Sequence, residues 1–159
     1  MLLFCNLKVS STENCNTPNI KLTDKKVYQS TTFKGFLTEY RTDRVFDGDR
    51  STCSCTEYLT NSWWTVDLQG VYSITCISIY NYDYYWTDIS GAKIYIGNSR
   101  QNNGTNNKLV QNITNFEKGH INVYEFSPSV SGRYVTVIRP ETNYMALCHV
   151  NITGTKMGT

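Results

Sequence analysis

The chain has 159 residues, of which 40% are hydrophobic and 18% are charged, and this balance is typical of one packed globular domain. Its 15 Lys and Arg residues against 13 Asp and Glu residues leave a net charge of +2, too small to indicate a nucleic-acid surface or a polybasic membrane anchor. No apolar run approaches the roughly 18 residues that a membrane span needs. We therefore expect a soluble chain with no nucleic-acid partner and no membrane insertion.

The residue types favour β-structure. The sequence contains 12 Tyr, 6 Phe, 3 Trp and 20 Thr, and aromatic and β-branched side chains are enriched in strands. Apolar residues do not recur at i, i+3, i+4 and i+7 over three turns, so long helices are not expected. The sequence predicts an all-β domain.

The domain is predicted to occupy residues 19–155. Residues 1–18 are polar after their first five and lack the basic start and full apolar stretch of a signal peptide, so we interpret them as an N-terminal arm or the remnant of a signal segment. Residues 156–159 form a tail. Alternating runs predict short strands at 27–32, 63–68, 71–80, 91–97, 123–126, 132–138 and 146–152, with a polar loop at 98–107.

These strands have faces that can be assigned from their alternation. In the run 63–68, Trp64, Val66 and Leu68 share one face, which we expect to be buried. About seven or eight short strands separated by turn residues are typical of a β-sandwich or jelly roll.

Cysteine usage indicates the compartment. The six cysteines are Cys5, Cys15, Cys53, Cys55, Cys76 and Cys148. None forms a C-x-x-C pair, which argues against a zinc ribbon or a thioredoxin-type motif. The even count, together with N-x-S/T sequons at Asn103, Asn112 and Asn151, favours secretion into an oxidising, glycosylating compartment. Cys5 and Cys15 are close enough in sequence to pair locally.

Several segments of the chain form an ordered set of motifs. They are Asn19–Leu22, Tyr28–Thr31, Val45–Asp49, Ser54–Thr56, Asn61–Leu68, Gly91–Gly97, Gly132–Val135 and Leu147–Cys148. This order resembles the F-type lectin domain, also called the fucolectin module. The resemblance covers roughly residues 19–154. It implies a discoidin-like jelly-roll β-sandwich of antiparallel sheets that binds L-fucose-containing glycans in a pocket at its loop end.

The chain departs from the residues that the family uses to bind fucose. The family has a His after a Ser-Cys-Thr run, then Arg-x-Asp, then a basic residue five positions on. Here Glu57 takes the place of the His, Asn81 or Tyr82 that of the first Arg, and Asp88 that of the second basic residue, while Asp83 matches the Asp. Because three donors are replaced, we expect an acidic pocket with altered or lost sugar specificity.

Aromatic residues follow at the same place. Tyr84 and Tyr85 stand where the family has paired cysteines, and Trp86 comes next. With Tyr82 they offer apolar faces on which a pyranose can stack. Tyr84, Tyr85 and Trp86 cannot all face inward in an extended segment, so at least one should be exposed.

The resemblance also implies a calcium site. Carried over, it comprises Arg44, Asp47, Asp49, Ser54, Cys148 and His149, several of them through backbone carbonyls. His149 replaces a carboxylate, and because nitrogen is a poor calcium ligand, affinity should fall unless Asp49 adds its own carboxylate. The alternative is that 47–49 forms only a turn with side-chain caps.

The family implies a Cys55–Cys148 disulfide. Cys53 and Cys76 match no family position. They pair with each other or with the arm cysteines, or Cys76 is a buried free thiol. Two further assignments are structural. Trp63 and Trp64 anchor the sandwich, and Asp67 takes a turn or an Arg as its partner.

Catalysis is not indicated. His120 and His149 are the only histidines, and neither lies in H-E-x-x-H, nor is there a G-x-S-x-G. A glycosidase reading has only Glu57, Asp83 and Asp88 as carboxylates that can converge. We predict a secreted, non-enzymatic, calcium-dependent carbohydrate-binding module that binds glycans or glycoproteins. A homo-oligomer is a candidate assembly for it. The alternative is a discoidin-like protein-binding adhesion module that has lost sugar recognition.

Overall fold

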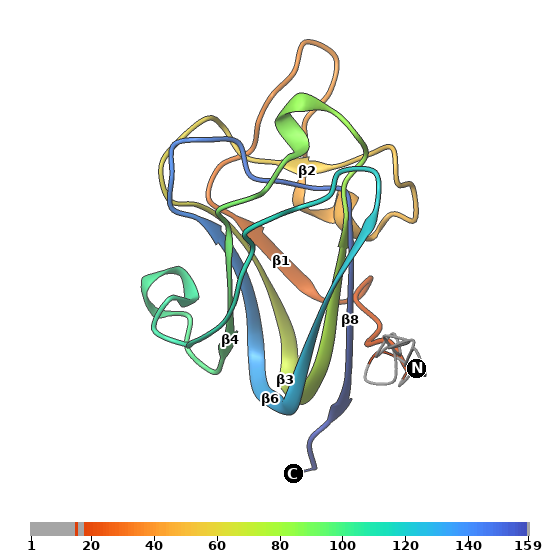
Figure 1. Ribbon diagram of the computed structural model, residues 1–159, viewed down its shortest axis with the longest axis vertical. Helices are drawn as coiled ribbons and strands as arrows, with labels where there is room; N and C mark the ends of the chain where they lie inside the picture. The colour runs from red at the N-terminus through yellow and green to blue at the C-terminus, as the bar shows by residue number, and fades with distance from the viewer. Residues whose placement is uncertain (1–14, 16–17, 159) are drawn as a thin grey trace, which may run out of the picture.

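The structure is a computed structural model, and it describes Cys15 and residues 18–158. Its strands pair antiparallel and form a sandwich whose open end carries the long loops (Figure 1). The strands are β1 (Lys26–Gln29), β2 (Ser54–Cys55), β3 (Ser62–Tyr80), β4 (Lys93–Gly97), β5 (Lys108–Asn112), β6 (Ile121–Arg139), β7 (Ala146–Leu147) and β8 (His149–Lys156). The predicted all-β sandwich of antiparallel sheets is confirmed.

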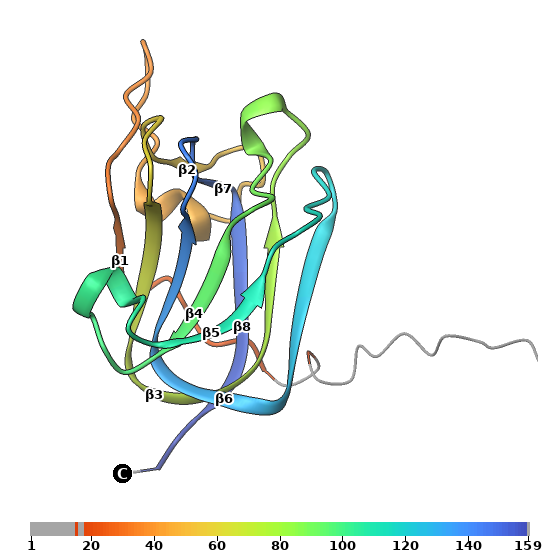
Figure 2. The ribbon, with the colours of Figure 1, turned by 60° about the vertical axis from the view of Figure 1, so that its left-hand side comes forward.

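Two long strands are shared by both layers of the sandwich. Strands β3 and β6 bend together at the end opposite the loops, and each sends one arm into each layer (Figure 2). One layer contains β1, β4, β5 and the 62–68 arm of β3, and the other contains β8 and the 72–80 arm. The predicted strands 63–68 and 71–80 are therefore two arms of one strand, and so are 123–126 and 132–138.

The bend has a local cause. The β3–β6 register shifts between Asp67 and Tyr72, and Gln69 within that gap adopts a left-handed φ of 60°. A Cβ at Gly132 of β6 would lie only 2.6 Å from Cγ2 of Ile96 on β4. Strands β4 and β6 therefore approach this closely beside the corner only because residue 132 is a glycine. Strand β6 also continues through Pro128, which lies at an exposed position of the corner between the predicted strands 123–126 and 132–138.

The core lies between the two layers. Trp64, Val66 and Leu68 are all buried, as the alternation of their run predicts. Opposing them are isoleucines of the second arm, Ile74, Ile77 and Ile79, whose spacing departs from strict alternation because of a register shift between residues 74 and 76.

Short 3-10 turns are the only helices in the described residues, and none could span a membrane. They are η2 (Thr42–Phe46), η3 (Tyr85–Thr87) and η4 (Gln101–Gly104). The turn η4 lies within the predicted polar loop 98–107, and β5, which the pattern missed, follows it.

Asp67 is held by an arginine, as predicted. Its carboxylate accepts hydrogen bonds from Arg133 Nε at 2.7 Å and Arg133 Nη2 at 2.9 Å. The hydrogen bonds from Arg133 lower the pKa of the Asp67 carboxyl group, and this effect is larger than the opposing rise caused by burial. The pair connects β3 and β6 beside the corner.

Candidate functional site

The loops gather at one end of the sandwich, which we call the loop end. It comprises segments 33–40, 56–61, 81–91 and 140–145, seen at the top of Figure 1. The segment after Tyr84 is not extended, as the sequence analysis assumed, but closes the turn η3, with the Thr87 hydroxyl donating to the Tyr82 and Tyr84 carbonyls. Tyr84 and Tyr85 are 50% and 78% exposed, which confirms that the run places rings at the surface.

Two buried polar side chains fix these loops. The Asn81 amide nitrogen donates to the Thr87 carbonyl at 2.7 Å and the Ala146 carbonyl at 2.9 Å, and its oxygen accepts from the Cys148 amide at 2.9 Å. Arg139 donates to the carbonyls of Asp88 and Tyr144 at 2.6 and 3.1 Å.

The assignment of Asn81 to sugar binding is therefore wrong. Its side chain is fully buried and its amide groups are occupied by the backbone of three segments. Asn81 is a positioning residue that attaches η3 to the β7–β8 segment.

Aromatic rings form a continuous cluster across the loop end. Neighbouring rings lie 4.8–6.4 Å apart between centroids, within the range of favourable aromatic pairs. We call this set the aromatic cluster, and it consists of Phe33, Tyr40, Tyr58, Tyr82, Tyr84, Tyr85, Trp86 and Tyr144. Its members come from four loops.

The aromatic cluster surrounds a cavity of about 80 Å³. Its lining residues are Phe33, Tyr40, Cys55, Tyr85, Trp86 and Tyr144. No charged side chain lines this cavity in the described part of the chain, and the predicted acidic residues Glu57, Asp83 and Asp88 lie outside its lining. Only Tyr85 and Trp86 of the predicted sugar-binding residues line it. The other three rings and the Cys55 thiol come from distant segments, and only a structure could have brought them together.

The remaining predicted residues lie around the cavity rather than in it. Tyr82 packs its ring 5.7 Å from that of Trp86, and burial raises the pKa of its hydroxyl to about 12. Glu57 is exposed two residues after Cys55, and its backbone amide donates to the Thr31 hydroxyl. The Asp88 carboxylate accepts from the Ser90 amide at 2.8 Å, which makes it a turn cap.

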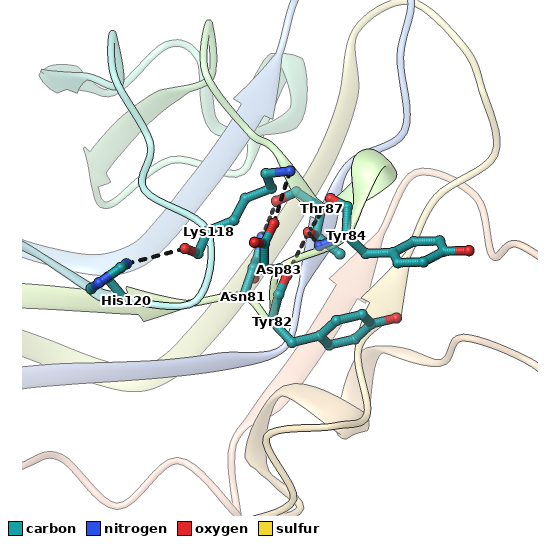
Figure 3. Close-up of polar contacts among 7 residues, drawn as sticks. All are labelled: Asn81, Tyr82, Asp83, Tyr84, Thr87, Lys118 and His120. Atoms are coloured by element: carbon teal, nitrogen blue, oxygen red, sulfur yellow. Dashed lines mark hydrogen bonds and ion pairs between the residues drawn. The ribbon is translucent and has the colours of Figure 1, made fainter.

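Lys118, a cation that the sequence pattern did not single out, lies beside Asp83, which matches the aspartate of the family pattern. Lys118 Nζ lies 3.0 Å from Asp83 Oδ1, and His120 Nδ1 is 3.2 Å from the Lys118 carbonyl. Figure 3 shows Lys118 meeting Asp83 on one side of the segment, while Tyr82 and Tyr84 point their rings to the other side. The side chain of Asp83 is thus paired away from the aromatic rings.

The disulfides differ from the predicted pairing. Cys148 pairs with Cys53, not with Cys55, which is a buried free thiol. The register explains this, since Ser54 faces Leu147 across β2 and β7, and the next residues outward on the two strands are Cys53 and Cys148. Burial raises the pKa of the Cys55 thiol to about 12.

The second disulfide joins the arm to β3. Cys76 pairs with Cys15, one of the alternatives considered, so neither a free Cys76 nor a local pair of Cys15 with Cys5 is found. Cys5 lies outside the described residues.

Two of the predicted calcium residues, Asp47 and Asp49, lie in an exposed turn. Asp47 accepts hydrogen bonds from the Asp49 amide at 2.9 Å and the Thr52 hydroxyl, and Asp49 Oδ1 accepts from the Ser51 amide at 2.8 Å and hydroxyl at 2.6 Å. The Ser51 contacts lower the pKa of Asp49. Asp49 Oδ2 makes no hydrogen bond in the described residues. These carboxylates offer oxygen ligands of the kind that calcium prefers.

The other members of the predicted set contribute no side-chain ligand. Arg44 directs its guanidinium to the Thr38 hydroxyl and over the Tyr40 ring, at 5.3 Å from its centroid. Ser54 Oγ donates to the Leu147 carbonyl at 3.3 Å, and Cys148 is bound in its disulfide. No group of three or more His, Cys, Asp or Glu side chains gathers anywhere in the described residues. A cation here would depend on backbone carbonyls beside Asp47 and Asp49.

His149 is the least suitable member. Its Nδ1 is buried and has no hydrogen-bond partner in the described residues. Burial, reinforced by the charge of Arg50, lowers the pKa of its imidazole, while the charge of Asp47 opposes the shift. The ring is therefore held toward its neutral form.

The chain matches known proteins over most of its length. Residues 44–137 match the F5/F8 type C model described as a NedA-like, galactose-binding domain. Fucolectin-1 of Anguilla japonica is 37% identical over 165 residues, which cover 96% of this chain and 93% of that protein.

Solved structures agree. The F-lectin (fucolectin) from the serum of the striped bass Morone saxatilis is 33% identical with a TM-score of 0.78, and the match covers 87% of this chain and 50% of that one. This chain thus spans half the length of the bass lectin. A fucose binding module of Streptococcus pneumoniae, 23% identical with a TM-score of 0.68, shares the fold over 87% of this chain and 99% of that one.

These relatives are lectins and carbohydrate-binding modules, which confirms the prediction that the chain is not an enzyme. The chain belongs to the fucolectin family of discoidin-like domains.

Proposed function

We propose that this domain is a carbohydrate-binding lectin whose ligand lies on the aromatic cluster at the loop end. The observation that carries the proposal is the cavity of about 80 Å³, which is lined by five aromatic rings and the Cys55 thiol. A pyranose presents apolar C–H faces that pack on aromatic rings, and the exposed Tyr84 and Tyr85 extend the surface beyond the cavity. The relatives named as fucolectins support a sugar as the ligand.

The specificity of this lectin differs from that of the family pattern. Glu57 and Asp88 replace basic donors, and Asn81 is occupied inside the protein. The cavity can hold an apolar part of the sugar, such as a ring methyl or the methyl of an acetamido group, but it offers no guanidinium fork for ring oxygens. We therefore propose a glycan held chiefly by apolar contact. Such a site binds weakly alone, so we also propose that the secreted lectin gains avidity as an oligomer.

Calcium belongs to this proposal as a structural ion. Asp47 and Asp49, with backbone carbonyls of their turn, would hold it, and bound calcium would supply positive charge that fixes the turn beside β2. Because His149 contributes no oxygen, affinity should be weak. Melting temperature measured with millimolar calcium and with chelator tests this, and equal values would contradict it.

A glycan array on the oxidised protein tests the proposed function. We expect signal on a defined group of glycans, and Tyr85→Ala and Trp86→Ala should reduce it at least about fivefold, because each removes a ring that the sugar packs on. Tyr95→Ala, on β4 away from the loop end, is the matched control. An array without signal from folded protein, or equal loss in the control, would overturn the proposal.

One observation favours the alternative of a protein-binding adhesion module. Phe36 and Leu37 are 101% and 89% exposed at the tip of the 33–40 hairpin, and a sugar site does not need them. Competition separates the two functions. A monosaccharide should displace a glycoprotein ligand from a lectin, and it should leave a protein–protein contact intact.

A further inference from the structure

A second pocket lies on the side of the sandwich, away from the loop end. It has a volume of about 70 Å³ and opens on the outer face of the layer that contains β1 and β4. We call it the lateral pocket, and its lining includes Trp63, Thr65, Ser99, Arg100, Asn103 and Tyr134. The loop around η4, coloured teal in Figure 2, forms one of its walls.

The floor of the lateral pocket is aromatic because of strand alternation. Trp64 and Val66 face the core, so Trp63 and Thr65 face outward, and Tyr134 takes the same side of β6 because Val135 is buried. Trp63 is half-buried, although an outward position on a sheet is more often polar. Trp63 therefore offers a flat apolar surface outside the core, and Tyr134, which is only 8% exposed, lies beside it in the floor of the pocket.

The wall is held rigidly before any ligand arrives. Asn107 Oδ1 accepts from the Ser99 amide at 2.9 Å, and Asn107 Nδ2 donates to the Ser99 carbonyl at 2.8 Å. Gly104, with a φ of 84°, lies so close to Thr136 that a Cβ there would be 2.4 Å from its hydroxyl. A preformed wall lowers the entropy that a ligand must otherwise overcome.

Several donors of the lateral pocket have no partner. Within the described residues, no hydrogen bond involves the guanidinium of Arg100, the carboxamide of Asn103 or the indole nitrogen of Trp63. Arg100 only stacks, with its Cζ 4.6 Å from the centroid of the Tyr28 ring. Rings that accept a sugar face thus stand beside free hydrogen-bond donors.

The charge of the lateral pocket is positive. The nearby carboxylate, Asp67, is already neutralised by two hydrogen bonds from Arg133. The Arg100 guanidinium therefore has no carboxylate partner and can receive an anion in its planar fork.

We propose that the lateral pocket is a second saccharide site, which takes a pyranose carrying a carboxylate or sulfate group. The sugar ring packs on Trp63 beside Tyr134, and Arg100 pairs with the anionic group. The site is independent of the loop end and does not rest on the function proposed there.

Titration of isotope-labelled protein followed by NMR tests the site. The protein is made in the bacterial periplasm, so that disulfides form and the Asn103 sequon stays unmodified. The probes are the methyl glycoside of sialic acid and N-acetylglucosamine 6-sulfate. Their controls are the methyl ester of the former and plain N-acetylglucosamine, which keep the ring and lose the charge.

We expect shifts of the Trp63 indole and the 99–104 amides with one or both anionic probes, and binding that weakens as salt is raised. A response to only one probe identifies the carboxylate or the sulfate as the preferred group. Arg100→Gln should weaken binding at least about tenfold, Arg100→Lys should weaken it less, and Arg41→Gln should not change it. Tyr85→Ala should also leave these shifts intact, which separates this site from the loop end.

Three results would overturn the proposal. They are no shifts with either anionic probe, equal affinity for the uncharged controls, and an Arg100→Gln protein that binds like the natural chain. Arg100 is exposed, so its variants should fold, and an unchanged spectrum outside the pocket verifies this.

Discussion

Arg133 donates to both carboxylate oxygens of Asp67, at 2.7 and 2.9 Å, across the two strands that both layers share. The Asp67 side chain is only 6% exposed, whereas that of Arg133 is 43% exposed. Removing the arginine therefore leaves a buried carboxylate without its partner. We predict that Arg133→Ala lowers the free energy of unfolding by about 1–3 kcal/mol, measured by urea denaturation.

Arg41→Ala is the control for this variant, because the Arg41–Asp43 pair is exposed on both sides. It should change stability by less than about 0.5 kcal/mol. Similar losses of unfolding free energy in Arg133→Ala and Arg41→Ala would show that the Asp67–Arg133 pair contributes no more to stability than an exposed ion pair.

The Asp67–Arg133 pair also predicts that the stability of the fold depends on pH. The pKa of Asp67 is lower in the folded chain than in the unfolded chain, chiefly because of Arg133. Its stabilising contribution is therefore present above the unfolded pKa of about 4 and is lost as pH falls toward the folded pKa. The stability difference between the natural chain and Arg133→Ala should thus be constant from pH 6 to 8 and shrink below pH 4. A difference that grows in acid would contradict this.

The disulfide pattern can be read from peptides. Digestion without reduction should yield Cys53 linked to Cys148 and Cys15 linked to Cys76. Cys55 should resist alkylation in the folded protein and react after denaturation, because it is buried and its pKa is raised to about 12. A Cys55–Cys148 peptide would instead restore the pairing that the family resemblance implies.

Loss of the Cys53–Cys148 disulfide should be costly. It links residues 95 positions apart, and Cys53→Ser should lower stability by about 2–5 kcal/mol in thermal or urea unfolding. Cys55→Ser, two residues away and equally buried, is the matched control and should cost less.

Asn81 should be sensitive to substitution although it contacts no ligand. Asn81→Ala leaves the Cys148 amide and the Ala146 and Thr87 carbonyls without their partner inside the protein, and we expect a loss of about 2–4 kcal/mol. Glycan binding should weaken as well, because η3 carries Tyr85 and Trp86. An unchanged free energy of unfolding would mean that water replaces these hydrogen bonds in the variant.

The exposed tip of the 33–40 hairpin should, unlike Asn81, tolerate substitution without loss of stability. Changing Phe36 and Leu37 to Ser should leave the unfolding midpoint unchanged, since neither side chain is buried, and should reduce retention on a hydrophobic column. Phe33→Ser, at the base of the same hairpin, removes a ring that packs on Tyr40 and Tyr144 and should lower the midpoint. A destabilised tip variant would show that the tip packs against the body.

Local pattern was sufficient for most of the strands and for the buried face of the run 63–68, although it missed β5. Trp64, Val66 and Leu68 are buried because alternation places them on the core side, and Asp67 took an arginine partner because a carboxylate within a strand requires one. The joining of two predicted strands into β3 could not be read this way, since the chain bends at Gln69 without breaking its pairing to β6.

The site depended on contacts between distant residues. Cys53 and Cys55 are two positions apart, and only the register of β2 against β7 decides which meets Cys148. The cavity joins Phe33 and Tyr40 to Tyr144 across more than a hundred residues, and no local pattern connects them. A family position also gave Asn81 a role in binding, whereas its burial gives it one in support.

The shared strands have a consequence for how the molecule unfolds. Because β3 and β6 each pass through both layers, neither layer can separate without breaking the hydrogen bonds of the other. Unfolding should therefore be a single cooperative transition, with amide exchange equally slow in the two arms of β3. The loop end lies at the far tips of these arms, so its exposed positions, such as Phe36 and Leu37, can change in sequence with little effect on that cooperative unit.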